Sequence, residues 1–509
     1  MAANSAVDAS LAGRLSRIRH ALPPTGPGRG PVTAVQADAG SVDMSWEPGL
    51  LRWFRHTNRV LDWSFFARPG GNFVQLCDRC GHLLIIDQRT LYYLQVMGAL
   101  TAGPGDITLI SSSAMSLQDD LLPLWVQAGT LSPASLASAY VVEDLRSCDR
   151  SLAGDTALAI GHALRHGQPV PVTPAVRWRE GCRDKLTRAA FLSLVGDRVY
   201  TSPLRGVAHD ELERFGVPMS ARHAITDKFE RSALYPAVSL SDTARQMLPT
   251  GYLTRSPEKA VGAVRELLRH TARVFVKADG IGGAAVAVVE SSRDAAAQIG
   301  SLQRRAKLNA IVGTGGAVPL GKRFFAPLEI AADMVMGERP LWHFTVQIRI
   351  AGSEAAPRVE ILNASAKEAG VAFGSRPLGA DGREALRALA PELAEIALAA
   401  RPPGCELLSL EGFVLSGDGP RIRLIEANLR LAGMSQTFLA SRAVAAAAGL
   451  GSAADYLVGN MPVDPRETNR EVLLRLRRAA ADGREVMLLG RENQDTAKVL
   501  TFPAAVPTA

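Results

Sequence analysis

The stretch VFVKADGIGGAAVAVV, residues 274–289, has the pattern of a β-strand, a glycine-rich turn and a second β-strand. The first strand ends near Lys277, and lysine is rare in this chain, since only eight of the 57 basic residues are lysine. Glycine has no Cβ and tolerates positive φ, so the turn lets backbone amides approach an anion while the lysine supplies a cation. The pattern favours a phosphate-binding hairpin with a triphosphate as its ligand, although many glycine-rich hairpins only reverse the chain.

A second stretch, SLEGFVLSGDGPRIRLIEANLR at residues 409–430, predicts a hairpin with hard oxygen ligands. Glu426 and Asn428 are two residues apart and share one face of a strand, and Glu411 reaches that face if the pairing register permits. Two carboxylates and an amide oxygen suit Mg²⁺ that bridges phosphates. Arg430 continues the same face, where it is placed to hold a developing negative charge. A solvent-facing polar stripe is the alternative, which the apolar residues around LIEAN disfavour.

With these two hairpins the sequence resembles the ATP-grasp enzymes, in which a lysine precedes a glycine-rich hairpin loop and Glu, Glu and Asn of a late hairpin bind magnesium. The resemblance covers about residues 90–437. It implies that ATP binds with two Mg²⁺ ions, or with Mn²⁺ in their place. Lys228 and Lys277 would contact the α- and β-phosphates, and the loop 279–284 would close over the triphosphate.

The same resemblance assigns roles to further residues. The adenine would meet a hinge in LEIAADMVMGE, residues 328–338, and the ribose would meet the end of that segment. Arg349, in the strand after the hinge, would contact phosphate or a substrate carboxylate. The nucleotide-binding set is then Lys228, Lys277, Asp279, Gly280, Gly282, Gly283, Asp333, Met334, Val335 and Glu338, the metal set is Glu411, Glu426 and Asn428, and the catalytic set is Lys277, Arg349 and Arg430.

Within this superfamily, the segments TVQIRI, LEGFVLSGDG and IEANLRLAG are most similar to the pheganomycin-type peptide ligases. That resemblance implies an ATP-dependent carboxylate–amine ligase that forms an acyl phosphate and releases ADP and phosphate, in peptide or specialised-metabolite biosynthesis. The chain departs from the pattern at LAGMSQT, where those enzymes have a glycine-threonine-histidine run, and at Glu411, where many members have Asp. The first departure leaves the acid and amine substrates open.

The implied fold class is α/β and α+β. A Rossmann-like pre-ATP-grasp domain would precede an ATP-grasp domain, whose two α+β subdomains clasp ATP, and a small C-terminal module would follow. The boundaries predicted from composition and strand pattern are an N-terminal arm at 1–45, the N-terminal α/β region at 46–226, the ATP-grasp domain at 227–437 and, at 438–509, a C-terminal part with a helix followed by a small module. Helices are expected at 255–271, 291–305 and 382–400.

Composition narrows the class of protein. A hydrophobic fraction of 47%, a charged fraction of 21% and a net charge of +7 spread along the chain are typical of an ordinary soluble globular protein and disfavour a nucleic-acid binder. No apolar run is long enough for a membrane span, and five cysteines without framework spacing favour a reducing compartment, so we expect a cytoplasmic protein. Cys77 and Cys80 have half the spacing of a zinc knuckle, with no second pair to complete it.

Three other interpretations of the sequence are open: one places the nucleotide at a different segment, and two keep the ATP site but change the function. The segment GAVPLGKR at 316–323 has P-loop spacing around Lys322 but lacks the Ser or Thr that a P-loop uses for Mg²⁺. An ATP-grasp enzyme that acylates a carrier-protein thiol, and a catalytically degenerate ATP-binding scaffold, are the alternatives to the ligase. The expected partners are carboxylate and amine substrates, small or peptidic; a carrier protein and a homodimer stay open.

Overall fold

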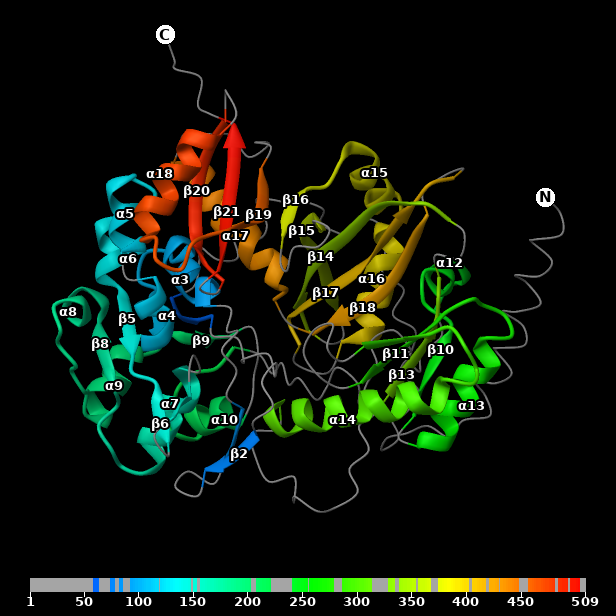
Figure 1. Ribbon diagram of the computed structural model, residues 1–509, viewed down its shortest axis with the longest axis horizontal. Helices are drawn as coiled ribbons and strands as arrows, with labels where there is room; N and C mark the ends of the chain where they lie inside the picture. Colours follow the sequence, from blue (N-terminus) through cyan, green and yellow to red (C-terminus); the bar gives the residue numbers. More distant parts are fainter. Residues whose placement is uncertain are drawn as a thin grey trace, which may run out of the picture.

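A computed structural model provides the structure of the chain (Figure 1). The residues that it describes are 58–63, 74–77, 82–85, 92–118, 120–147, 150–152, 156–202, 207–220, 240–254, 256–278, 286–313, 328–334, 338–353, 356–367, 374–401, 405–417, 421–429, 431–447, 456–480, 484–492 and 495–503.

The first large sheet is mostly parallel, in agreement with the α/β class predicted for the N-terminal region. Its strand order is β8-β5-β4-β1-β9, and β1, β4, β5 and β9 run parallel while β8 is antiparallel to β5. Strands of a parallel sheet are buried on both faces, and every residue of β1 and β4 is buried here. The strands are β1 (Arg59–Asp62), β4 (Ile107–Ser111), β5 (Ala139–Val142), β8 (Val172–Pro174) and β9 (Val199–Thr201), and the helices of this region are α3 (Tyr92–Thr101), α4 (Ser112–Leu117), α5 (Leu121–Gln127), α6 (Pro133–Ala137), α7 (Thr156–Arg165), α8 (Ala175–Arg179), α9 (Arg188–Val195) and α10 (Val207–Arg214).

The hairpin at residues 274–289 belongs to a four-stranded antiparallel sheet with the order β10-β13-β11-β12. Along β11 the side chains alternate between buried and half-buried, so Val274 and Val276 face a core that α13 and α14 cover, and Lys277 faces the other way. The elements are β10 (Gly251–Thr254), α13 (Pro257–Leu267), β11 (Val274–Ala278), β12 (Val286–Val289), α14 (Ala295–Gly313) and β13 (Leu328–Ala332).

The hairpin at 409–430 belongs to a five-stranded antiparallel sheet with the order β16-β15-β14-β17-β18. One face is apolar, with Phe344, Val346 and Leu410 in a core that includes α15 and α16, and the other face presents polar side chains. The helix predicted at 382–400 is two helices that meet at Leu389, because Pro391 has no N–H to donate and begins a new helix. The elements are α12 (Asp242–Gln246), β14 (Pro340–Gly352), β15 (Pro357–Lys367), β16 (Ser375–Pro377), α15 (Ala380–Ala388), α16 (Ala390–Ala400), β17 (Leu407–Leu415) and β18 (Ile422–Asn428).

The described residues of the C-terminal segment form two helices and a three-stranded antiparallel sheet, in the order β19-β21-β20, that packs on the N-terminal layer. Trp125 donates its indole N–H to the carbonyl of Leu488, and Gln118 exchanges two hydrogen bonds with the backbone of Arg491. Figure 1 shows this sheet beside α3. The elements are α17 (Gly433–Ala447), β19 (Leu457–Pro462), α18 (Asn469–Ala479), β20 (Arg484–Arg491) and β21 (Thr496–Pro503).

Two short hairpins lie outside these sheets: β2 (Val74–Cys77) pairs with β3 (His82–Ile85), and β6 (Leu145–Ser147) pairs with β7 (Arg150–Leu152). Among the described helices, none has the length and apolar character needed to cross a membrane. The predicted boundary between the ATP-grasp domain and the C-terminal module, at residue 437, falls inside helix α17. The domain limits stay a prediction.

Candidate active site

The register of β17 and β18 brings the predicted metal-binding side chains to one face of the sheet. Glu411 lies directly opposite Glu426, and Ser409 lies directly opposite Asn428. Directly opposite residues of an antiparallel pair point the same way, with Cβ atoms about 5 Å apart. The register that the sequence left open therefore places Glu411, Glu426 and Asn428 together on the polar face.

This register depends on Gly412. The pairing shifts immediately after Glu411, where two residues of one strand face one of the other. A Cβ on Gly412 would lie 2.2 Å from the carbonyl oxygen of Arg423, so only glycine fits this bulge without moving the backbone. The glycine thus sets the position at which Glu411 meets Glu426.

Glu411 is held by two nitrogen groups from neighbouring strands. His343 Nε2 on β14 and Lys367 Nζ on β15 each lie 2.8 Å from its Oε1 atom. Burial and the adjacent Glu426 raise the pKa of Glu411, but the hydrogen bond from His343 and the charge of Lys367 outweigh them, and the pKa is lowered overall. Glu411 is thus kept ionised, as a metal ligand must be. The ring of Phe413, 4.6 Å from that of His343, packs beside it.

Lys277 reaches from the four-stranded sheet to this face of the five-stranded sheet. Its ammonium group donates to the carbonyl of Ile425, the residue before Glu426, and lies 3.7 Å from Glu329 Oε1. Burial lowers the pKa of Lys277, but the carboxylates of Glu329, Glu426 and Glu411 outweigh burial and raise it. The structure therefore brings the strand-end lysine of one hairpin to the acidic face of the other.

The described hinge residues have partners of their own. The carboxylate of Asp333 is 2.9 Å from Arg273 Nε, at the opposite end of β11 from Lys277, and Glu338 pairs with Arg421. Met334 is half-buried after β13. Their assignment to adenine and ribose stays a prediction.

Arg349 lies on the same face of β14 but farther along the strand. It is four residues beyond Thr345, the residue opposite Glu411, which corresponds to about 13 Å. Its Nη1 atom is 3.3 Å from Glu360 Oε2. In this structure Arg349 is thus not beside the carboxylate pair. The other predicted site residues lie outside the described residues: Lys228, Asp279, Gly280, Gly282, Gly283, Val335 and Arg430, as do Lys322 of the P-loop-like segment and Cys80.

Sequence reasoning missed four residues of this site. Glu329 is directly opposite Lys277 across β11 and β13, and its signal was a lone acid in the apolar strand LEIAA. His343 and Lys367 had no local signal beyond their strand positions. Gln347 was also missed: its Oε1 accepts from the Ala432 amide and the Ser435 hydroxyl, which ties the start of α17 to the polar face.

The donor set fits a magnesium ion bound with phosphate. Carboxylate and amide oxygens are the hard ligands that Mg²⁺ prefers, and phosphate oxygens and water commonly supply its remaining ligands. No group of three or more His, Cys, Asp and Glu side chains in the described part of the chain is arranged to hold a metal ion. In the predicted metal set the third protein oxygen would be the amide of Asn428, which shares the face of Glu411 and Glu426, and the nucleotide would complete the coordination.

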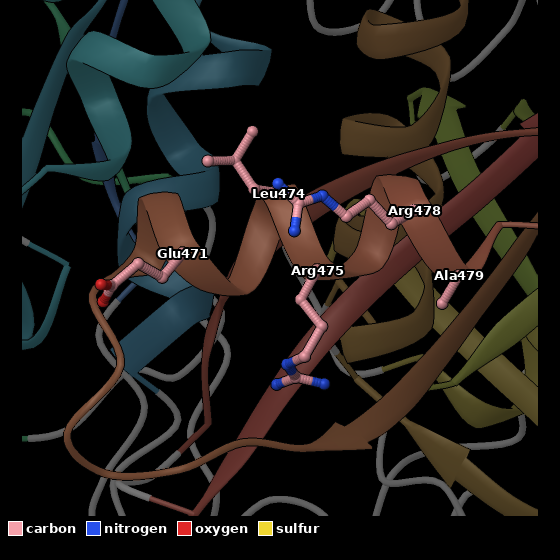
Figure 2. Close-up of a pocket in the computed structure, with 5 residues that line it drawn as sticks. All are labelled: Glu471, Leu474, Arg475, Arg478 and Ala479. Atoms are coloured by element: carbon pink, nitrogen blue, oxygen red, sulfur yellow. The ribbon is translucent and has the colours of Figure 1, made fainter.

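An open pocket of about 540 Å³ lies elsewhere, along α18 (Figure 2). Glu471, Leu474, Arg475, Arg478 and Ala479 line it, all from one helix. Glu471 caps the helix through Thr468, and Arg475 pairs with Glu467. The pocket contains none of the predicted site residues and offers no convergent catalytic groups.

No protein-family model and no curated protein matches the chain. Among solved structures, the chain is similar to carboxyaminoimidazole ribonucleotide synthase of Aspergillus clavatus complexed with ATP, at 15% identity, 62% coverage of this chain, 80% of the other and a TM-score of 0.38. Biotin carboxylase of Campylobacter jejuni aligns at 11% identity, 81% and 84% coverage and a TM-score of 0.41. D-alanyl-alanine synthetase A of Vibrio cholerae aligns at 11%, 65% and 90% coverage and 0.30.

Superpositions this loose carry no conclusion about substrates or about individual site residues.

Proposed function

We propose that this protein is an ATP-dependent ligase that joins a carboxylate to an amine through an acyl phosphate. One observation supports this most directly: the ammonium group of Lys277 from one sheet meets the face of another that carries Glu411 and Glu426. A cation beside a pair of carboxylates on rigid strands can hold a triphosphate through the lysine and its metal through the acids.

Each residue then has a defined task. Lys277, aligned by Glu329, would bind phosphate oxygens, and Glu411, Glu426 and Asn428 would hold Mg²⁺, which supplies charge neutralisation at the transferring phosphoryl group. Lys228 and the glycine-rich loop would complete the phosphate contacts. Arg430 would bind the substrate carboxylate and the oxyanion that forms at its carbon. Arg349, farther along β14 and paired with Glu360, would assist only if it moves toward the carboxylate pair.

The reaction needs no nucleophile from the protein. A carboxylate oxygen of the substrate attacks the γ-phosphorus and ADP leaves with the bridging electrons. The amine nitrogen then attacks the acyl carbon, the C–O bond to phosphate breaks, and the nitrogen loses a proton to solvent. Positioning and charge compensation are the protein's contributions. We propose a peptide or specialised-metabolite pathway as the setting, with amino acids and short peptides as the first substrates to screen.

Oxygen labelling tests the proposal. With an ¹⁸O-labelled carboxylate substrate we expect ADP and one labelled oxygen in the released phosphate. Hydroxylamine should also trap the acyl group as a hydroxamate when the amine is left out. Label in AMP would instead indicate adenylation, and phosphate labelled only from solvent water would indicate a simple ATPase; either result rejects the acyl-phosphate mechanism.

A further inference from the structure

Lys367 makes a contact that the proposed reaction does not by itself explain. It is the last residue of β15, and its ammonium crosses β14 to reach Glu411 on β17. The separation between Lys367 Nζ and Glu411 Oε1 is 2.8 Å. The lysine therefore contacts one of the two carboxylate oxygens through which Glu411 would bind a metal.

The acidic face needs such a cation when no metal is present. Glu411 is only 14% exposed and directly opposite Glu426, and two neighbouring buried carboxylates repel each other unless positive charge compensates them. Lys277 supplies one cation on the Glu329 and Glu426 side. Lys367 supplies another on the Glu411 side.

Lys367 and a metal ion would compete for the Glu411 carboxylate. A bound Mg²⁺ lies about 2.1 Å from each ligand oxygen, so an ammonium that stays on the same atom would repel it strongly. Lys367 is also able to leave, because its side chain is 34% exposed and its stem is flexible. When Lys367 leaves Glu411, its ammonium group needs another anion nearby, and a bound triphosphate would supply one.

We propose that Lys367 is the internal counter-ion of the metal site. The lysine excludes a divalent cation until a nucleotide binds and its phosphate replaces Glu411 as the partner of the lysine. The inference rests on the proposed function and adds an order of assembly to it: metal and nucleotide enter together. Binding of the two is then positively coupled, and such coupling is reciprocal between the two ligands.

Binding of Mn²⁺ alone tests the inference without turnover. Free Mn²⁺ is measured by its electron paramagnetic resonance signal, with and without a non-hydrolysable ATP analogue. In the wild type we expect weak binding of Mn²⁺ alone and much tighter binding with the analogue. In Lys367→Met we expect Mn²⁺ alone to bind about tenfold more tightly, with the enhancement by the analogue reduced, in the range of ordinary coupling energies.

Two variants control for charge and for folding. Lys367→Arg keeps the cation and should bind Mn²⁺ alone as weakly as the wild type. Lys259→Met removes the same charge from an exposed position on α13 and should change little. All variants are checked by thermal melting.

The outcomes separate this inference from the proposed function. If folded Lys367→Met binds Mn²⁺ alone no more tightly than the wild type, while the wild type still binds Mn²⁺ with the analogue, the counter-ion role is wrong and the nucleotide site stands. If the wild type binds no Mn²⁺ with the analogue, both the site and this inference fail.

Discussion

Lys277 is a cation with a side chain only 13% exposed, and the carboxylates of Glu329, Glu426 and Glu411 stabilise its charge. In the absence of ligand these acids stabilise its charge, so the lysine does not need a phosphate to be accommodated in the fold. Substituting Lys277 should therefore affect stability as well as ligand binding. The experiment needs a control substitution at an exposed lysine.

Substituting Lys277 should abolish nucleotide binding. Lys277→Ala removes the cation that we assign to the phosphates, so binding of the Mg²⁺-ATP analogue should weaken at least a hundredfold, since charge-assisted phosphate contacts in a dry site are each worth roughly 3 kcal/mol. Titration calorimetry measures this, with Lys259→Met as the exposed control. If Lys322→Ala loses binding and Lys277→Ala keeps it, the nucleotide belongs to the segment 316–323.

Glu426 should matter for rate more than for folding. Glu426→Gln keeps the shape of the side chain and removes one charge from a face that carries two adjacent carboxylates, so repulsion with Glu411 falls while metal affinity also falls. We expect turnover to drop by about a hundredfold or more, with the melting temperature unchanged or higher. A variant that melts several degrees lower yet turns over normally would show that Glu426 is structural.

At the scale of elements, the β17–β18 hairpin determines where the side chains of the predicted metal site lie. Apolar residues at alternate positions of β17 and β18 fix which face meets the core, and this automatically turns the acids to the other face. Alternation alone does not fix the register between the strands. The bulge at Gly412 supplies that information.

Gly412→Ala should therefore damage both the hairpin and the metal site. The new Cβ would meet the Arg423 carbonyl at 2.2 Å, so the backbone must move, at a cost of about 1–3 kcal/mol. We expect a lower melting temperature and loss of Mn²⁺ binding in the presence of nucleotide. Gly459→Ala on the edge strand β19, where a Cβ meets nothing within 4 Å, is the control and should be near neutral. Equal behaviour of the two variants would show that the bulge does not set the site.

At the scale of the whole molecule, the sequence predicted what depends on local pattern and missed what depends on distant pairing. The parallel layer, both hairpins and the shared face of Glu426 and Asn428 follow from periodicity and turn residues. Glu329 and Lys367 belong to strands whose neighbours are set by how the sheets assemble. A short stretch of sequence carries no information about that pairing. Glu411 depended on the register, so the sequence left its position open.

The attachment of the C-terminal sheet to the N-terminal layer is another distant pairing. Residues of β20 and β21 share one core with α3, although about 400 residues of chain separate them. Lys498 on β21 lies in this region with a fully buried side chain, 5.2 Å from the ring centre of Tyr93 and 3.7 Å from Glu492 Oε2. Burial lowers its pKa to about 8, against the opposing effect of Glu492.

The lowered pKa makes stability depend on pH with a defined sign. Between about pH 8 and 10.5 the unfolded chain holds the Lys498 proton more tightly than the folded chain does. The protonated lysine therefore destabilises the folded state at the low end of this window, and this destabilisation decreases as the pH rises. Relative to Lys498→Met, which has no proton to lose, the wild type should gain stability from pH 7.5 to pH 10, by an amount on the order of 3 kcal/mol. Urea unfolding of both proteins at a series of pH values measures this difference, and titrating groups that the two proteins share cancel from it. Parallel stability curves across the window would show that Lys498 keeps its ordinary pKa in the folded protein, and a wild type that loses stability relative to the variant would reverse the sign.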